Sequence, residues 1–180
     1  PTKNLGCFGD GGLVVVKSKK NYEILKKLRT HGGIRRNQHD LIGYNSRLDE
    51  IQAAILNIKL DFIESFIKKR KIIAEMYYKK IRNDKVRLPF TSKGSVHTYN
   101  QFTIRVKNRR KLELHLKKHK IPYGIYYSMP MYKYNAYKNN NYQPLPMAEK
   151  VSKECLSIPI YPELPIKHVI KISDVLNNYE

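Results

Sequence analysis

Residues 43–56 read GYNSRLDEIQAAIL and predict the start of the most regular element in this chain of 180 residues. Ser46 and Asp49 have the spacing of a helix capping box. Apolar residues then recur every three or four positions over residues 48–62, which is the period of one helix face. We therefore expect one long amphipathic helix to fill most of residues 46–82, with its apolar stripe packed in a core.

The segment before this helix, residues 1–45, holds too few elements to form a domain alone. It opens with a glycine-dense loop and continues with a β-branched run over residues 13–17 that favours a strand. Apolar spacing predicts a helix over residues 21–30, and a loop with three glycines follows over residues 31–44. A single strand has no sheet to join here, so we expect residues 1–45 to be the C-terminal remnant of a larger domain.

Residues 83–180 have the element order of a small α/β domain that follows a polar linker. Strands are expected over residues 101–106, 123–127 and 156–160. Helices are expected over residues 109–120, 147–155 and 166–178. A tract rich in Tyr, Asn and Lys lies between the second strand and the second of these helices, at residues 132–143.

The chain is strongly basic, with a formal net charge of +20 and a pI near 9.9. Such a charge suits phosphorylated substrates, nucleic acid or an anionic membrane surface. Lysines outnumber arginines by 25 to 10, and the abundance of Lys, Asn, Ile and Tyr equally fits codon bias in an AT-rich genome. We expect bias together with a mild preference for anionic substrates, with nucleic acid an unlikely partner.

Cysteine content and hydropathy bear on the compartment. Cys7 and Cys155 are too few and too far apart for a disulfide framework or a metal site, so no metal is expected. No apolar run approaches the length of a membrane span, so no membrane contact is expected. Both observations favour a reducing cytoplasm.

Lys3 stands in the run PTKNLG, shortly before a glycine turn at residues 9–12. From composition alone it is one of 25 lysines, most of which are solvated surface charges. The glycine turn lacks the spacing of a P-loop or of a dinucleotide-binding loop. We interpret it as a tight turn.

Three runs together carry a resemblance to a known family. They are PTKNLG with GDGG (residues 1–12), GYNSRLD (residues 43–49) and LSIPIYPEL (residues 156–164). The chain resembles the C-terminal half of the DegT/DnrJ/EryC1/StrS family of PLP-dependent nucleotide-sugar aminotransferases. The resemblance implies an α/β fold, the C-terminal part of a fold-type I PLP-dependent transferase. Its parts would be the end of the large domain, a long linking helix over residues 46–82 and a small α/β domain over residues 83–180.

The resemblance also implies the chemistry of Lys3. In the family this lysine holds pyridoxal 5'-phosphate (PLP) as a Schiff base, and it later moves a proton between the amino donor and the cofactor. The cofactor acts as the electron sink. The implied reaction is amino transfer, usually from glutamate, to a keto-sugar nucleotide used in surface polysaccharide or glycan synthesis.

Three residues near the predicted linking helix correspond to positions at the family's site. Asn45 matches the asparagine that reaches the PLP phosphate of the other subunit, which implies a homodimer with shared active sites. Asn is also common at helix-entry turns. Arg47 would face either the phosphate or the sugar, or it would form a surface ion pair. His31 lies in a loop that borders the site in relatives, although a lone loop histidine is more often solvated.

The chain departs from the family pattern at Tyr132 and Tyr134, which stand where relatives usually carry His and Gln. In relatives this stretch lies on the sugar-nucleotide side, so Tyr132 is a candidate substrate contact. The departure puts substrate specificity, or activity itself, in doubt.

The family is about twice as long as this chain. The acidic partner of the pyridine nitrogen, the residue stacked on the ring and most phosphate ligands lie in its N-terminal half. We therefore expect the isolated chain to be inactive and to pair with a missing N-terminal half. A non-catalytic remnant or dimerisation subunit and a basic nucleic-acid-binding module remain alternatives, the last resting on residues 132–143.

Overall fold

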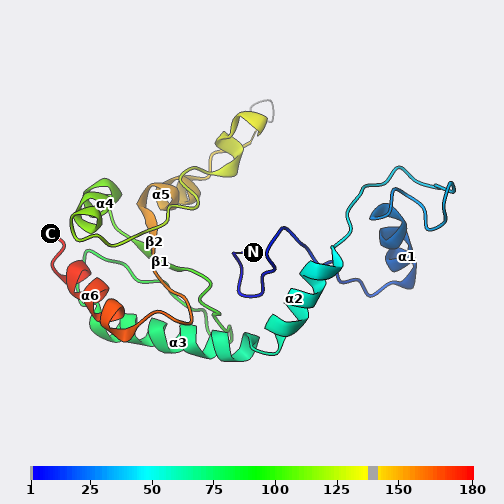
Figure 1. The fold of residues 1–180 in the computed structure, drawn as a ribbon. Helices are drawn as coiled ribbons and strands as arrows, with labels where there is room; N and C mark the ends of the chain where they lie inside the picture. Colours follow the sequence, from blue (N-terminus) through cyan, green and yellow to red (C-terminus); the bar gives the residue numbers. More distant parts are fainter. Residues whose placement is uncertain (1, 138–141) are drawn as a thin grey trace. The chain divides into compact units, whose positions relative to one another are not determined.

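The computed structural model describes residues 2–137 and 142–180, and the chain divides into two compact units, Pro1–Ile63 and Glu64–Glu180 (Figure 1). The division falls inside the segment expected to be the linking helix. The assignment of residues 1–45, 46–82 and 83–180 to three parts of a larger fold stays a prediction.

The first unit contains two helices, α1 (Lys19–Leu28) and α2 (Glu50–Leu60), and its described residues form no strand. The strand predicted over residues 13–17 is therefore wrong. Leu13 and Val15 are 89% and 83% exposed, and residues 2–63 offer no neighbouring strand. A β-branched run favours a strand only where another strand can pair with it.

The helix predicted over residues 21–30 is confirmed as α1, although both ends of α1 lie two residues before the predicted bounds. Ser18 caps its start, because the Ser18 Oγ atom accepts a hydrogen bond from the Asn21 amide at 3.4 Å. Lys26 and Lys27 occupy its last turn, where the helix dipole favours cations.

The single helix predicted over residues 46–82 is wrong, because two helices, α2 and α3 (Ile63–Lys80), occupy this segment. Asp61 ends α2, and the Phe62 amide donates to the Lys59 carbonyl oxygen at 3.1 Å. That bond closes a tighter turn than the α-helical pattern, and Asp is a weak helix former. The apolar period continues through this point, so periodicity alone gave no sign of the break.

The predicted capping box at Ser46 is also wrong. The N-cap of α2 is Asp49, whose side chain makes no capping bond. The Ser46 amide instead donates to the Arg29 carbonyl oxygen at 3.0 Å, so Ser46 belongs to the preceding loop.

The second unit is built around a two-stranded antiparallel sheet, β1 (Phe102–Arg105) and β2 (Cys155–Ile158). These strands confirm the predictions over residues 101–106 and 156–160. The strand predicted over residues 123–127 is wrong, since only Gly124 pairs, through an isolated bridge to Ser157.

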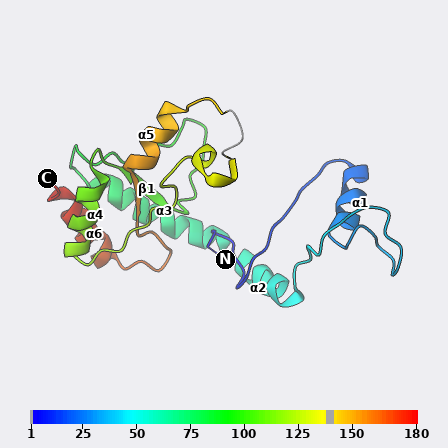
Figure 2. The same ribbon diagram turned by 90° about the horizontal axis from the view of Figure 1, so that it is seen from above.

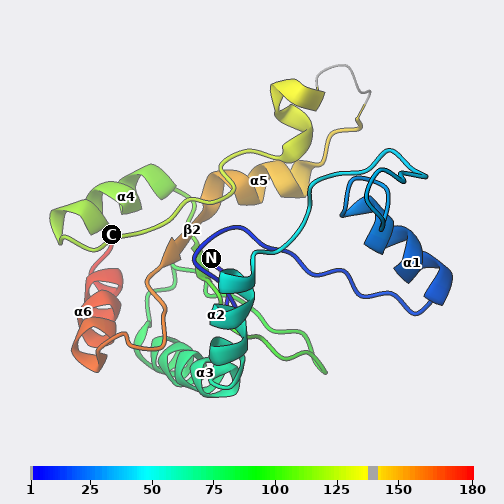
Figure 3. The ribbon, with the colours of Figure 1, turned by 45° about the vertical axis from the view of Figure 1, so that its right-hand side comes forward.

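Three helices of the second unit were predicted and are confirmed. They are α4 (Arg109–Lys118), α5 (Pro146–Glu154) and α6 (Ile166–Asn177). Figure 3 shows α5 leading directly into β2. α4 and α6 lie side by side (Figure 2), and the His115 Nε2 atom is 2.8 Å from the Val175 carbonyl oxygen. The tract at 132–143 begins with short 3₁₀ turns, η1 (Met131–Lys133) and η2 (Asn135–Tyr137), and its residues 138–141 lie outside the described residues.

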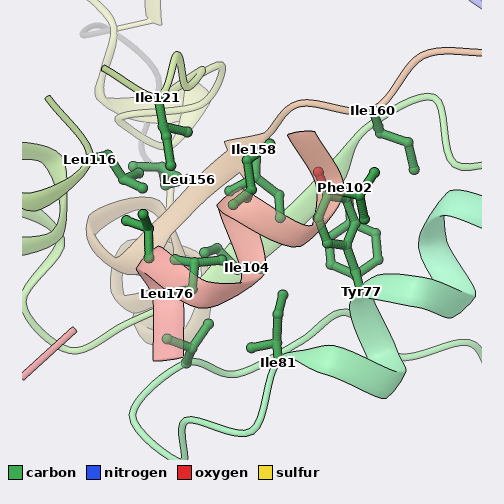
Figure 4. Close-up of a cluster of buried hydrophobic side chains, with 14 of the residues drawn as sticks. Tyr77, Ile81, Phe102, Ile104, Leu116, Ile121, Leu156, Ile158, Ile160 and Leu176 are labelled. Atoms are coloured by element: carbon green, nitrogen blue, oxygen red, sulfur yellow. The ribbon is translucent and has the colours of Figure 1, made fainter. Parts of the chain in front are cut away.

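The second unit has a continuous apolar core (Figure 4). Its fully buried members include Tyr77, Phe102, Ile104, Leu112, Leu116, Leu156, Val169 and Leu176. The Tyr77 hydroxyl donates to the Pro159 carbonyl oxygen at 2.8 Å, which satisfies the polar tip of a ring that is 0% exposed. Among residues 2–63, by contrast, the only buried apolar side chain is Cys7.

Candidate active site

The loop that carries Lys3 is fastened to α2 a few residues further along. The Lys59 Nζ atom donates to the Gly6 carbonyl oxygen at 2.6 Å, and the Gln52 Oε1 atom accepts from the Phe8 amide at 2.8 Å. A Cβ atom on Gly9 would lie 3.3 Å from Gln52 Nε2, so the loop approaches the helix closely. One helix thus holds both sides of the buried Gly6–Cys7 pair.

Lys3 itself precedes the part of the loop that is bonded to α2. Its side chain is exposed and makes no hydrogen bond or ion pair with the part of the chain that the structure describes. A primary amine without a carboxylate partner keeps its nitrogen accessible to a carbonyl carbon. Lys3 therefore takes no part in a structural ion pair among the described residues.

A second loop brings the ends of residues 28–46 together through backbone hydrogen bonds. Thr30 and Asn45 form an isolated antiparallel bridge. The His31 amide donates to the Tyr44 carbonyl oxygen at 2.9 Å, and the Tyr44 amide donates to the Leu28 carbonyl oxygen at 2.7 Å. His31 and Asn45, which are 14 positions apart, therefore lie on adjacent backbone segments.

Glycines make this close approach sterically feasible. Gly32 has φ +84°, and a Cβ atom there would lie 1.6 Å from the Leu41 carbonyl oxygen. A Cβ atom on Gly43 would lie 2.1 Å from the Gly32 amide nitrogen. Only glycine therefore fits at Gly32 and Gly43, where two backbone segments of the loop are in contact. The loop that was predicted from its glycines is consequently ordered.

An ion pair fastens the same loop to α1. The Lys27 ammonium donates to the Asp40 carboxylate, and this contact holds the pKa of Asp40 below its usual value. Lys27 also accepts the Gly32 amide through its carbonyl oxygen at 2.8 Å.

Asn45 and Arg47 contact each other in this loop. The Arg47 Nε atom donates to the Asn45 Oδ1 atom at 3.1 Å, and both residues are exposed. Arg47 thus meets an amide and not a carboxylate, so the surface ion pair considered from the sequence is not formed among the described residues. The bond leaves the Asn45 amide NH₂ group and the Arg47 terminal nitrogens free to donate to an anion.

Lys3 joins this set by no hydrogen bond. His31, Asn45 and Arg47 share one loop, whereas Lys3 lies in a separate segment of the same unit, and within residues 2–63 the Lys3 side chain makes no hydrogen bond to these three residues. The imidazole of His31 is exposed, and its backbone has φ 62°.

Tyr132 belongs to the second unit and is held in a small polar network. Its hydroxyl donates to the Glu149 carboxylate and accepts from the Leu145 amide at 3.3 Å. The Lys133 Nζ atom lies 2.7 Å from Glu149 Oε2. The hydrogen bond from Lys133, and next in size the one from Tyr132, hold the pKa of Glu149 below its usual value. Sequence reasoning missed Glu149, because nothing in its spacing marks it.

A pocket of about 500 Å³ lies beside Tyr132, and its walls are mostly apolar. The lining residues are Pro130, Met131, Tyr132, Tyr137, Tyr142, Gln143, Leu145 and Ala148. Tyr134, the other departure from the family pattern, is not among them and is 40% exposed.

Two further classes of site find no support in the described residues. No group of three or more His, Cys, Asp or Glu side chains could hold a metal ion within residues 2–137 and 142–180. Over the same residues, no helix combines the length and the apolar character that crossing a bilayer requires.

Comparison with known proteins extends over the whole chain. The DegT/DnrJ/EryC1/StrS aminotransferase family model matches residues 1–177. A protein of Geobacillus stearothermophilus named pleiotropic regulatory protein is 37% identical over 169 residues, which are 91% of this chain and 45% of the relative. The UDP-N-acetyl-3-dehydro-alpha-D-glucosamine 3-aminotransferase of Acidithiobacillus ferrooxidans is 34% identical over 98% of this chain and 48% of its own length.

The fold matches solved structures to the same extent. DesV of S. venezuelae, crystallised in complex with a ketimine intermediate, has a TM-score of 0.94 at 34% identity. The match covers 99% of this chain and 49% of DesV, so the chain spans about half the length of the relatives it matches. Because the family match runs from the Lys3 loop to the end of α6, the chain belongs to the DegT/DnrJ/EryC1/StrS aminotransferase family.

Proposed function

We propose that this chain supplies the lysine-bearing half of a PLP-dependent sugar aminotransferase, which transfers an amino group from a donor such as glutamate to a keto-sugar nucleotide. The relatives at 30% identity and above include several named as transaminases of UDP- and dTDP-linked sugars. The observation that carries the proposal is Lys3, whose exposed amine projects from a loop anchored to α2 inside the family-matching span.

The residues present fit part of a PLP site. Lys3 offers an unpaired primary amine for the cofactor's aldehyde, and Asn45 and Arg47 offer exposed donors for its phosphate. The resemblance places the acidic partner of the pyridine nitrogen and the ring-stacking residue in the other half of the family's length. The set therefore suits a site that is completed by other residues.

The proposed chemistry divides between the cofactor and Lys3. When bound, PLP supplies the electron sink that stabilises negative charge at the donor's Cα atom. Lys3 would hold the cofactor through its Nζ atom. The same amine would serve as the acid and base that moves the proton away from the donor's Cα atom. Arg could not do this, because it stays protonated and is a poor nucleophile.

We assign supporting roles to the second loop. Asn45 would donate its NH₂ group to the cofactor phosphate, and Arg47 would hold the Asn45 carbonyl oxygen so that the NH₂ group faces outward. His31 would border the substrate side of the same loop. These roles imply a homodimer in which each subunit contributes the loop to its partner's site.

Tyr132 is proposed as a contact on the sugar-nucleotide side. Its ring lines the pocket of about 500 Å³, whose aromatic walls suit the flat face of a base or a sugar ring. Glu149 fixes the ring by accepting its hydroxyl, so Tyr132 would act through its ring face more than through its hydroxyl.

The proposal concerns the complete protein. The 180 residues alone would not catalyse transamination, and they would act after pairing with the half that the relatives possess. A non-catalytic or dimerisation role is the alternative that a negative result would favour. A cytoplasmic location is proposed because Cys7 and Cys155 are both free thiols.

The test requires the upstream half to be restored. Borohydride reduction followed by peptide mass mapping should fix PLP on Lys3, and Lys3→Ala should abolish both the label and turnover. Lys19→Ala, an exposed lysine of the same unit, is the matched control and should change neither. PLP fixed on another lysine would refute the assignment of Lys3, and absence of any label would favour the non-catalytic alternative.

A further inference from the structure

A basic hollow of about 900 Å³ lies wholly within the second unit and outside the residues assigned to amino transfer. It is formed by the segment before β1, the end of β1, the start of α4, and parts of α5 and the C-terminus. Its cationic lining residues are Lys85, Arg87, Arg105, Lys107, Lys111 and Lys150.

The backbone forces two of these cations together. Arg87 and Arg105 face each other across an isolated antiparallel bridge, with each amide donating to the other's carbonyl oxygen at 2.9 Å. Like charges directly opposite one another on paired strands are destabilising. Glu154 relieves only one of them, because its carboxylate pairs with the Arg105 guanidinium at 2.7 Å.

Among the residues that the structure describes, the other five cations have no side-chain partner. Within residues 2–137 and 142–180, the side chains of Lys85, Arg87, Lys107, Lys111 and Lys150 make no ion pair or hydrogen bond. Apart from Glu154, the carboxylates that line the hollow are those of Asp84 and Glu180. An excess of uncompensated positive charge is thus concentrated around one concavity.

The first turn of α4 adds to this potential. Asn108 caps the helix by accepting the Lys111 amide at 3.0 Å, and both residues line the hollow. The positive end of the helix dipole therefore lies at the same wall as the side-chain cations. This contribution is secondary to the five unpaired charges.

We propose that the hollow binds an anion carrying two or more linked phosphate groups, the chemistry shared by inorganic pyrophosphate and nucleoside diphosphates. A single carboxylate could neutralise only one or two of the cations, whereas linked phosphates present several oxygens to Arg and Lys at once. The volume lies in the range of about 300–1,000 Å³ that is usual for small-molecule sites. The inference does not depend on the proposed aminotransferase activity.

Isothermal titration of the full chain with inorganic pyrophosphate, at about 0.15 M ionic strength, tests the site. Lys107→Gln/Lys111→Gln removes two exposed cations of the hollow. We expect the double variant to raise the Kd for pyrophosphate about tenfold, which corresponds to about 1.4 kcal/mol. Lys117→Gln/Lys118→Gln makes the same charge change at the other end of α4, outside the hollow, and should shift the Kd by less than about twofold.

The remaining arms decide the outcome. Arg87→Gln provides a second variant if the lysine pair fails to fold by circular dichroism, and it should also weaken binding. A second titration with UDP distinguishes the source: tighter binding than pyrophosphate identifies a nucleotide, and equal binding identifies the phosphates alone. Equal losses in the hollow variant and its control, or preferential binding of a single-stranded oligonucleotide, would overturn the proposal.

Discussion

Tyr77 offers a quantitative test of the core of the second unit. Its ring is 0% exposed and its hydroxyl donates to the Pro159 carbonyl oxygen at 2.8 Å. Replacement by Phe keeps the ring and removes only the hydroxyl. Below pH 9 we expect Tyr77→Phe to lower the free energy of unfolding by about 1–1.5 kcal/mol, the usual value for one buried hydrogen bond.

The same substitution should matter less as the pH rises. Burial raises the pKa of the Tyr77 hydroxyl well above its ordinary value near 10. The unfolded chain therefore loses this proton while the folded chain keeps it, and stability falls with pH above about 10. By pH 11 this term reaches about 1.4 kcal/mol in the wild-type chain and is absent from Tyr77→Phe. The two proteins should then be about equally stable.

Urea unfolding followed by circular dichroism at pH 8, 9.5 and 11 would measure this difference. Lysines titrate in the same range in both proteins, so the difference between them isolates Tyr77. Tyr127→Phe, at a ring that is 65% exposed, is the control variant and should leave the free energy of unfolding at pH 8 nearly unchanged. A destabilisation by Tyr77→Phe that stays constant from pH 8 to 11 would refute the reasoning.

Three further predictions concern the loops and the division of the chain. Gly32→Ala should expose the Leu41 amide to hydrogen exchange, because its Cβ atom would lie 1.6 Å from the Leu41 carbonyl oxygen, whereas Gly12→Ala meets nothing within 4 Å and should leave exchange unchanged. The pKa of Glu149 is lowered, so the interaction of its carboxylate with the Tyr132 hydroxyl should be fully present above about pH 4.3 and be lost as the pH falls through the lowered pKa. Tyrosine fluorescence should report this transition in the wild-type chain, and the transition should be absent from Glu149→Gln. Limited proteolysis should cleave residues 2–45 before the second unit, and equal resistance of both would contradict the difference in burial.

Most of the correctly predicted elements of the second unit share one property. The helices α4 and α6 and the strands β1 and β2 carry apolar residues at the period of their own structure, and these residues contribute to the core of the second unit. Local pattern and tertiary packing agree there, so the pattern sufficed. The predicted strand at residues 13–17 failed because its pairing partner is not among residues 2–63. The break at Asp61 was hidden because the apolar period continued across it.

The residues of the candidate site could be predicted from the sequence only where they stand in a family motif. Lys3 and Asn45 could be proposed from the PTKNLG and GYNSRLD runs, yet neither composition nor spacing separates Lys3 from 24 other lysines. The contacts of Lys59 and Gln52 with the Lys3 loop could not be predicted, because each residue lies more than 40 positions from its partner in the loop. Gln52 does stand in the run that follows GYNSRLD, which was a usable signal.

The two runs that carry the candidate cofactor-binding residues lie in the first unit, whereas the apolar core lies in the second, and this separation bears on how the protein works. The Lys3 loop and the Asn45 loop belong to the unit in which Leu13, Val15 and Ile42 are 89%, 83% and 96% exposed. Exposed apolar side chains of this number are unfavourable in water unless another surface covers them. Under the proposed function, the residues that complete the PLP site would also cover these side chains. Covering this unit and completing the proposed site would then be one event, so we expect cofactor binding and stability of the first unit to be gained together.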